Sequence, residues 1–104
     1  MLEIHKDNFQ QEVLDSPGLV VVDFWSPKCE PCMELKPHLE QLAAKHPEVK
    51  FCQLNIIPNR RTALNQKVFG LPAVVFYRQG KKVAELTREF EIEDVEAKLK
   101  ELTG

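Results

Sequence analysis

The chain of 104 residues lacks the features that mark membrane-spanning and nucleic-acid-binding proteins. Its longest apolar runs, at residues 19–22 and 71–77, fall far short of the ~20 residues that a membrane-spanning helix needs. The 14 basic and 16 acidic residues give a formal net charge of −2, without the basic stripe that nucleic-acid binders carry. We therefore expect no membrane partner and no nucleic-acid partner.

The sequence also has no internal repeats, no low-complexity tract and no linker rich in glycine, serine or proline. A length of 104 residues is typical of one globular domain, and a hydrophobic fraction of 43% is enough for one packed core. Residues 1–7 contain neither a basic start nor an apolar stretch, so we expect no secretory signal. These observations predict a single domain over residues 1–104, a monomer located in the cytoplasm.

Apolar and polar residues follow one another in a pattern that predicts strands and helices in turn. Strands are expected at residues 2–5, Leu19–Trp25, 49–55, Ala73–Arg78 and 82–87. Helices are expected at residues 7–14, 29–46 and 60–68, and in a last segment with a buried stripe of Ile92, Val95, Leu99 and Leu102. Asp7 would cap the first helix, and Pro37 should kink the second.

The order of these elements, βαβαβαββα, predicts an α/β fold. The early alternation of strands and helices implies parallel strands joined by right-handed crossovers. A tight turn at Gln79 and Gly80 adds an antiparallel pair at the end of the sheet. We therefore expect a mixed central sheet flanked by helices.

Cysteine is scarce in this sequence. Three cysteines are too few, and an odd number, for a small protein that disulfides hold together. Cys29 and Cys32 lie three positions apart in the predicted first turn of the long helix, where two thiols can close a small disulfide. Free N–H groups and the helix dipole favour a thiolate at Cys29, while Cys32 lies further inside. This asymmetry predicts that Cys29 attacks a substrate disulfide and Cys32 resolves the mixed disulfide. Pro31 is tolerated between them because an N–H in the first turn has no helical partner.

The same cysteine spacing could also be half of a zinc site, which needs two more ligands. The sequence has no second pair of cysteines at this spacing. The other candidate ligands, which form no recognised pair, are Cys52, His5, His38 and His46. We expect His38 and His46 on the solvent face of the long helix, and we expect no metal.

The cysteine pair lies within a longer run that resembles a known family. Residues 21–32 read Val-Val-Asp-Phe-Trp-Ser-Pro-Lys-Cys-Glu-Pro-Cys, and they resemble the active-site stretch of the thioredoxins, Asp-Phe-Trp-Ala-x-Trp-Cys-Gly-Pro-Cys. Residues 70–73, Gly-Leu-Pro-Ala, look like the cis-proline loop of that family. Pro37 matches its helix-kinking proline, and the Gln79–Gly80 turn matches its hairpin. The likeness covers essentially the full chain and implies the thioredoxin fold.

The resemblance assigns roles around the cysteine pair. Cys29 would be the nucleophile and Cys32 the resolving thiol. Asp23 would be a carboxylate buried beneath them, with a pKa raised by desolvation, that holds or relays the proton of Cys32. The alternative places Asp23 at a strand end near solvent. Trp25 would shape the rim of the site, or else be plain core.

The resemblance also suggests how a substrate is held. Pro72, if its peptide bond is cis, would hold its loop against the disulfide. The backbone of Leu71 could then pair with an extended substrate segment as an added strand. A trans Pro72 in an ordinary turn is the alternative.

The sequence departs from the family pattern on the surface that a partner would touch. Glu30 replaces a glycine between the cysteines, and Lys28 replaces an aromatic residue just before them. Their charges act in opposite directions on a Cys29 thiolate. Glu89 falls close to a family glycine on the substrate-binding rim. A more acidic and less apolar rim predicts a narrower set of partners.

Two further positions differ from the family or stand alone. Gln53 falls where many thioredoxins keep a buried lysine near the aspartate, so the pKa of Asp23 should lie higher without that cation. Cys52 lies in a predicted strand whose alternation does not fix which way its side chain faces. We expect a buried, inert thiol there, with a regulatory thiol as the alternative.

The leading hypothesis is a thiol–disulfide oxidoreductase that reduces disulfides in client proteins, with the Cys29–Cys32 dithiol as its only redox group and no cofactor. Family resemblance implies that a flavin-containing, NADPH-dependent reductase recharges it. An oxidase or isomerase role is disfavoured by the lack of an export signal. The main alternative is a thioredoxin-like protein-binding module whose redox activity is secondary.

Overall fold

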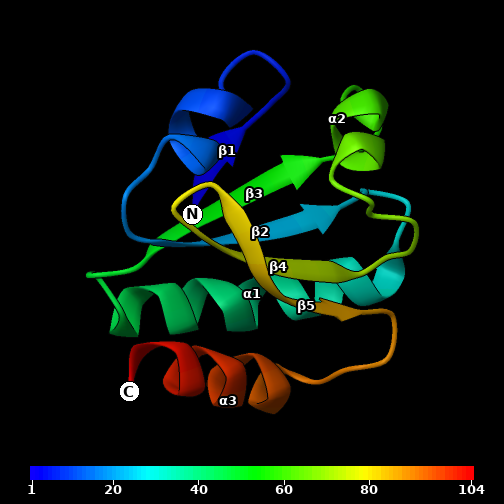
Figure 1. The fold of residues 1–104 in the computed structure, drawn as a ribbon. Coiled ribbons are helices and arrows are strands. Elements are labelled where there is room, and N and C mark those ends of the chain that lie inside the picture. Colours follow the sequence, from blue (N-terminus) through cyan, green and yellow to red (C-terminus); the bar gives the residue numbers. More distant parts are fainter.

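The computed structural model describes all residues from 1 to 104 and places them in one mixed sheet with helices on both faces (Figure 1). The strands are β1 (Leu2–Ile4), β2 (Leu19–Trp25), β3 (Lys50–Asn55), β4 (Ala73–Arg78) and β5 (Lys81–Thr87). The helices are a one-turn π-helix η1 (Gln10–Leu14), α1 (Glu30–Lys45), α2 (Arg60–Asn65) and α3 (Ile92–Thr103). No helix is both long enough and apolar enough to cross a membrane. The predicted fold class and order of elements are confirmed.

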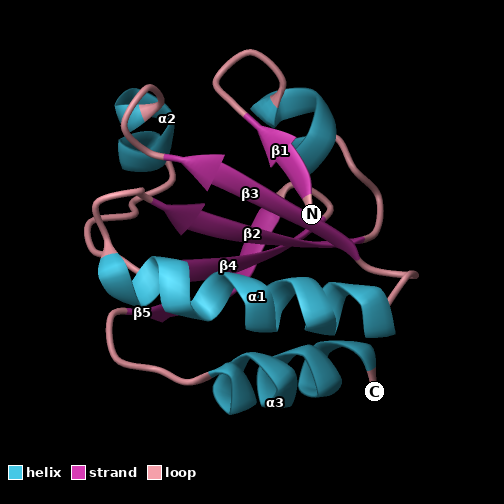
Figure 2. Ribbon diagram, turned by 180° about the vertical axis from the view of Figure 1, so that it is seen from behind, coloured by secondary structure: helices cyan, strands magenta, loops and turns pink.

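The sheet has the order β1-β3-β2-β4-β5, with β2 at its centre. Strands β1, β3 and β2 run parallel, and β4 runs antiparallel to both β2 and β5. The helices α1 and α3 cover one face, while η1 and α2 lie over the other (Figure 2). Because both faces of β2 are covered, six of its seven residues are buried, which explains its nearly unbroken apolar sequence.

Alternation along β2 divides its side chains between two hydrophobic clusters. Val20, Val22 and Phe24 belong to the cluster beneath η1 and α2. Leu19 and Val21 belong to the cluster beneath α1 and α3. Asp23 follows this second set by the same alternation, so its side chain lies on the α1 side of the sheet. The strand thus delivers one carboxyl group into an otherwise apolar layer.

The hairpin between β4 and β5 requires residues that accept a positive φ. Gln79 has φ of 53° and Gly80 has φ of 77°, as in the type I′ turn that matches the twist of paired strands. A Cβ atom at Gly80 would lie 2.8 Å from the carbonyl oxygen of Leu14. Glycine therefore serves both the turn and its close approach to the end of η1.

Two predicted helices are shorter in the structure. The helix expected at residues 7–14 is only η1, and Asp7 is not its cap: the Asn8 side chain accepts the His5 N–H at 2.8 Å and forms a turn before it. The helix expected at residues 60–68 ends at Asn65, because Lys67 adopts a positive φ of 61°. In contrast, α1 continues unbroken through Pro37.

Candidate active site

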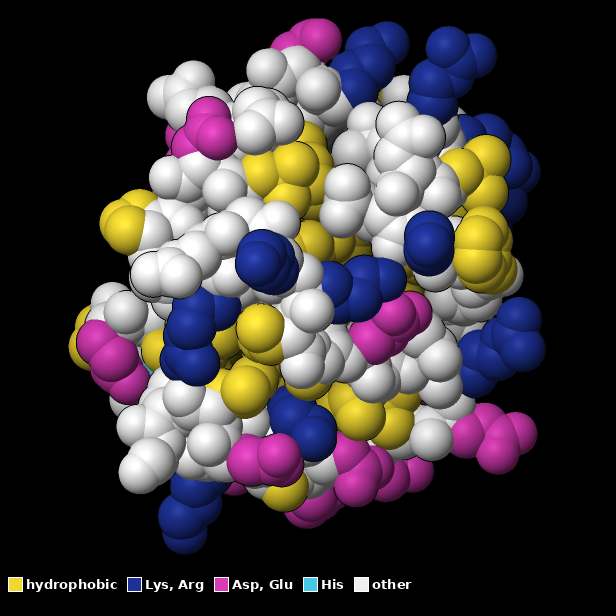
Figure 3. Space-filling view, viewed as in Figure 1, with side chains coloured by type: hydrophobic (Ala, Val, Ile, Leu, Met, Phe, Trp, Pro, Cys, Tyr) yellow, Lys and Arg dark blue, Asp and Glu magenta, His cyan; other side chains and the backbone are white.

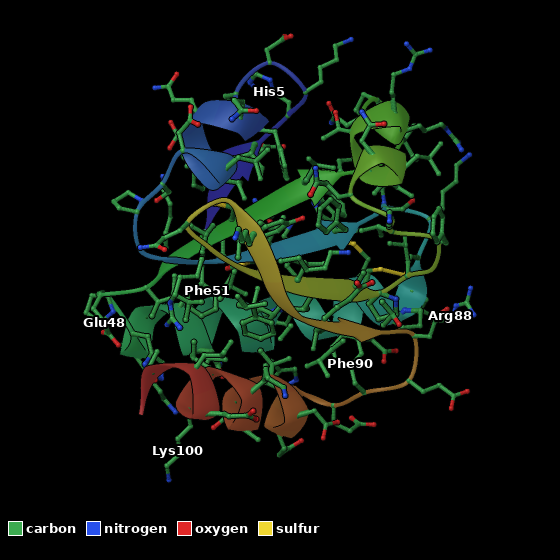
Figure 4. All side chains as sticks on the ribbon, in the orientation of Figure 1. His5, Glu48, Phe51, Arg88, Phe90 and Lys100 are labelled. Carbon is green, nitrogen blue, oxygen red and sulfur yellow. A yellow bond between two sulfur atoms is a disulfide. The ribbon has the colours of Figure 1, made fainter.

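Cys29 and Cys32 are joined by a disulfide at the start of α1, where the chain leaves the carboxyl end of β2 (Figure 4). Cys29 is the N-cap of α1, and its Sγ accepts the N–H of Cys32 at 3.3 Å. The first N–H groups of a helix have no helical partner and carry the positive end of the helix dipole. The site therefore favours negative charge on the Cys29 sulfur when the disulfide is open.

The two sulfurs differ in how far a partner can reach them. Cys32 is 1% exposed, whereas Cys29 is half-buried and reaches the surface. A macromolecule that docks here meets Cys29 first. The exposure agrees with the order in which the sequence predicted that the two cysteines act.

A tight turn before the helix fixes Cys29 at this position. Ser26 is 6% exposed, and its carbonyl oxygen accepts the N–H of Cys29 at 3.0 Å. Its hydroxyl oxygen accepts the N–H of Lys28 at 3.1 Å. Sequence reasoning missed Ser26, although a serine before a proline is a known turn signal. The flanking residues Lys28, Glu30 and Pro31 are all exposed and form the rim beside the disulfide.

Asp23 lies in the middle of the sheet, so the strand-end alternative is wrong. It is 1% exposed and stands opposite Gln53 on β3 and Val74 on β4. Neither of its carboxyl oxygens has a hydrogen-bond partner. Burial raises the pKa of Asp23 to about 7, and the positive charge of Lys36 limits the rise.

The polar side chains around Asp23 come from three elements. Trp25 is half-buried, and its Nε1 has no hydrogen-bond partner; the same is true of Oε1 of Gln53. The ammonium of Lys36 lies 3.9 Å from the centre of the Trp25 ring. The raised pKa of Asp23 agrees with the prediction drawn from the missing lysine at position 53, although α1 supplies another cation, Lys36. Its spacing of four residues from Cys32 could have signalled this, since such pairs share a helix face.

The loop before β4 lies beside the same end of the sheet. The peptide bond between Leu71 and Pro72 is cis, and the Pro72 carbonyl oxygen accepts the N–H of Arg88 at 2.8 Å. A Cβ atom at Gly70 would overlap the guanidinium of Arg88, so this loop and the end of β5 are closely packed. The backbone of Leu71 makes no hydrogen bond within the protein. Its N–H and C=O groups are therefore available to an added strand.

A groove of about 650 Å³ joins this loop to the disulfide region, with Pro31 and Pro72 both in its lining. Its apolar lining includes Leu35 and Ile92, and its basic side chains are only Arg88 and His38. The acidic residues that line it are Glu34, Glu89, Glu91, Glu93 and Asp94. Figure 3 shows acidic side chains gathered on the lower part of this face, where α3 lies in Figure 1. The surface beside the disulfide is thus acidic, as the departures at Glu30 and Glu89 suggested.

Cys52 lies on the other side of the sheet from the disulfide. It is fully buried in the cluster beneath η1 and α2, and burial raises the pKa of its thiol to about 11. A thiol with such a pKa stays protonated and unreactive at neutral pH. His38 is exposed and His46 is half-buried at the end of α1. Nowhere do three His, Cys, Asp or Glu side chains gather into a group that could hold a metal ion.

Comparison with known proteins agrees with this geometry. The Thioredoxin family model matches residues 1–101. A thioredoxin of Acetoanaerobium sticklandii is 44% identical over 90 residues, which cover 86% of this chain and 86% of the relative. A thioredoxin of Peptoclostridium acidaminophilum is 46% identical over 90 residues, which cover 86% of this chain and 82% of the relative. The chain therefore belongs to the thioredoxin family and is a thiol–disulfide oxidoreductase that reduces protein disulfides.

Proposed function

We propose that Cys29 is the nucleophile and Cys32 the resolving thiol in the reduction of client disulfides. In the reduced protein, the Cys29 thiolate attacks one sulfur of the client disulfide. A mixed disulfide forms, and the first client sulfur leaves as a thiolate. Cys32 then attacks the Cys29 sulfur, the Cys29–Cys32 disulfide closes, and the second client sulfur leaves. Two electrons have passed to the client. The observation that carries this proposal is the contrast between a half-buried Cys29 at the helix N-cap and a fully buried Cys32.

Cys32 must lose its thiol proton before it can attack, and we assign the acceptor of that proton to Asp23. The carboxyl is buried on the α1 side of the sheet and has no hydrogen-bond partner of its own. Burial raises its pKa to about 7, so both the proton-accepting and the proton-donating forms are populated near neutral pH. A group with this balance can take the proton from Cys32 and later release it.

Client binding would use the loop that carries Pro72. The free N–H and C=O groups of Leu71 support its pairing with an extended client segment as an added strand. The side chain of Trp25 and the exposed rim of Lys28, Glu30 and Pro31 would bound the site. Hydrogen bonds to the client's backbone give affinity that does not depend on the client's side chains. Selectivity among clients therefore has to come from the charged surface around the Pro72 loop.

A flavin-containing, NADPH-dependent thioredoxin reductase would return two electrons to the Cys29–Cys32 disulfide after each cycle. We place this activity in the cytoplasm, in a single-domain monomer, because a dithiol that reduces clients needs a compartment in which thiols stay reduced. The measurement that tests the direction of electron flow is the reduction potential of the pair, equilibrated with dithiothreitol buffers. We expect a value below the cytosolic glutathione poise. A value well above it would show that the protein works as an oxidant.

The acidic groove predicts a preference among clients. Segments that carry lysine or arginine next to their disulfide should be reduced faster than segments with acidic neighbours, because opposite charges speed the encounter. In a Glu89→Lys/Glu93→Lys variant, we expect reduction of a lysine-flanked peptide disulfide to slow about three- to tenfold relative to a glutamate-flanked one. Competition between the two peptides at low salt measures this ratio.

A matched variant controls for the change in net charge. Glu48→Lys/Glu101→Lys reverses two exposed carboxylates at the end of the molecule opposite Arg88, where Glu48 is labelled in Figure 4. Its peptide ratio should equal that of the wild type. High salt should shrink the difference between groove variant and wild type. Equal rates for both peptides with the wild-type protein would rule out the preference and, with it, this basis for a narrowed partner set.

A further inference from the structure

A lysine on α1 packs over Trp25, two residues along β2 from the buried carboxyl of Asp23. Lys36 is half-buried and follows Cys32 by four residues, so both side chains lie on the same face of the helix. Its ammonium sits 3.9 Å from the centre of the Trp25 ring. Trp25 and Asp23 are two residues apart on β2 and therefore point to the same side of the sheet. Asp23 and Trp25 thus lie on the side of the sheet covered by α1, the helix that carries Cys32 and Lys36.

The other elements that flank Asp23 bring no charge to it. The neighbouring strands place Gln53 and Val74 opposite it, and neither side chain ionises. On α1, Cys32 is buried, and Lys36 is the one charged side chain of the helix that is not exposed. The charge of Lys36 accordingly opposes the effect of burial on the pKa of Asp23 and is the one charge that acts on it appreciably.

The contact with Trp25 restrains the lysine. A cation over an indole ring is attracted by the negative face of the ring, and the attraction grows as water is excluded. A lysine side chain that was free in solvent would be screened and would sample many rotamers. Held over Trp25, the ammonium stays in a position from which its charge acts on the Asp23 carboxyl, and the side chain is only half-buried.

We propose that Lys36 is a positioning residue for the resolving step, and that its ammonium, held over Trp25, increases the share of Asp23 in the carboxylate form that accepts the proton of Cys32. The inference rests on the proposed role of Asp23. In the step, the Cys32 thiol gives its proton to the carboxylate, and the resulting thiolate attacks Cys29 and releases the client sulfur. The Lys36 charge stabilises the carboxylate before the transfer and stays on the lysine throughout.

The test follows the resolving step alone. Reduced protein is mixed with a slight deficit of a chromogenic aromatic disulfide, 5,5′-dithiobis(2-nitrobenzoate), in a stopped-flow instrument. The first coloured thiolate is released when Cys29 attacks, and the second when Cys32 resolves the mixed disulfide. Only the second phase is independent of reagent concentration. Its rate is measured against pH for the wild type, Lys36→Met and Lys36→Arg.

We expect Lys36→Met to move the midpoint of the second phase upward by about one pH unit, which slows resolution at pH 7 about fivefold. Lys36→Arg keeps the charge and should restore the wild-type midpoint. The exposed Lys45 on the same helix provides a matched control, and Lys45→Met should change nothing. Trp25 is the sole tryptophan, so the pH titration of its fluorescence in the reduced protein gives an independent readout that should shift in the same direction.

Two further variants separate this inference from the role of Asp23. Asp23→Asn should abolish the pH dependence, and adding Lys36→Met to Asp23→Asn should cause no further change. If Lys36→Met leaves the midpoint in place while Asp23→Asn removes it, the inference about Lys36 is wrong and the role of Asp23 stands. If Asp23→Asn leaves the profile unchanged, the proposed role of Asp23 is wrong, and the inference about Lys36 is wrong with it.

Discussion

Replacing Cys29 with serine is expected to reduce the turnover of a protein disulfide to the rate measured without protein. A serine hydroxyl cannot form a disulfide, and the buried Cys32 cannot reach a client in its place, since it is 1% exposed. Reduction of insulin by dithiothreitol, followed by the precipitation of its freed chains, measures the effect. Activity that persists in Cys29→Ser would mean that another group starts the exchange.

Cys32→Ser should lose turnover to a similar extent but for a different reason. The mixed disulfide between Cys29 and a client forms and then cannot be resolved, so it accumulates as a covalent adduct that non-reducing electrophoresis detects. Cys52 provides the matched control, because Cys52→Ala removes the third thiol and should leave turnover unchanged. If Cys32→Ser gives no adduct with any disulfide substrate, the assignment of the two cysteines fails.

Replacing Asp23 with asparagine should stabilise the protein at high pH. The pKa of this carboxyl is raised from 3.8 to about 7 in the folded state, chiefly by burial. In the unfolded chain it ionises near its ordinary value. As pH rises from about 4 to 7, the unfolded state gains a charge that the folded state resists, and unfolding becomes easier. Above pH 7 the loss is complete and amounts to about 4 kcal/mol at most.

Urea unfolding of the oxidised protein at several pH values measures this effect. Asp23→Asn should match the wild type near pH 3.5 and exceed its free energy of unfolding by an increasing amount up to pH 8. The exposed Asp7 gives a control, because Asp7→Asn changes an acid that is not buried in the core. A gain for Asp23→Asn that is the same at every pH would show that packing, and not ionisation, is its cause. The gain should come with slower resolution by Cys32, so stability and activity change in opposite directions.

Much of this site could be predicted from the sequence, because its two cysteines lie close together in the chain, in one turn of a helix. The alternation of elements gave the fold, and the positions of Cys29 and Cys32 in the first turn of a helix predicted which is more exposed. The burial of Asp23 and the cis bond at Pro72 came from the family resemblance. The resemblance also covers the strands, and their long apolar runs indicate which of them lie at the centre of the sheet.

The contacts that escaped prediction join residues from different elements. Lys36 reads as an ordinary surface lysine until the packing of α1 on β2 places it over Trp25. The hydrogen bond from Arg88 to Pro72 depends in the same way on how the end of β5 meets the loop before β4. The first helix begins only at Gln10, after a turn in which the Asn8 side chain accepts the N–H of His5. Periodicity describes which face of an element is buried, but it does not identify the polar group that lies opposite.

The central sheet also separates the third sulfur from the other two. Cys52 is packed beneath η1 and α2, whereas the Cys29–Cys32 bridge lies at the edge next to α1. A wrong pairing would need the sulfurs to meet across a layer of hydrogen-bonded strands, and this can happen only if the chain unfolds. The protein can therefore pass through many rounds of oxidation without scrambling its own bonds, and wrongly bridged species should form only when denaturant and oxidant are present together.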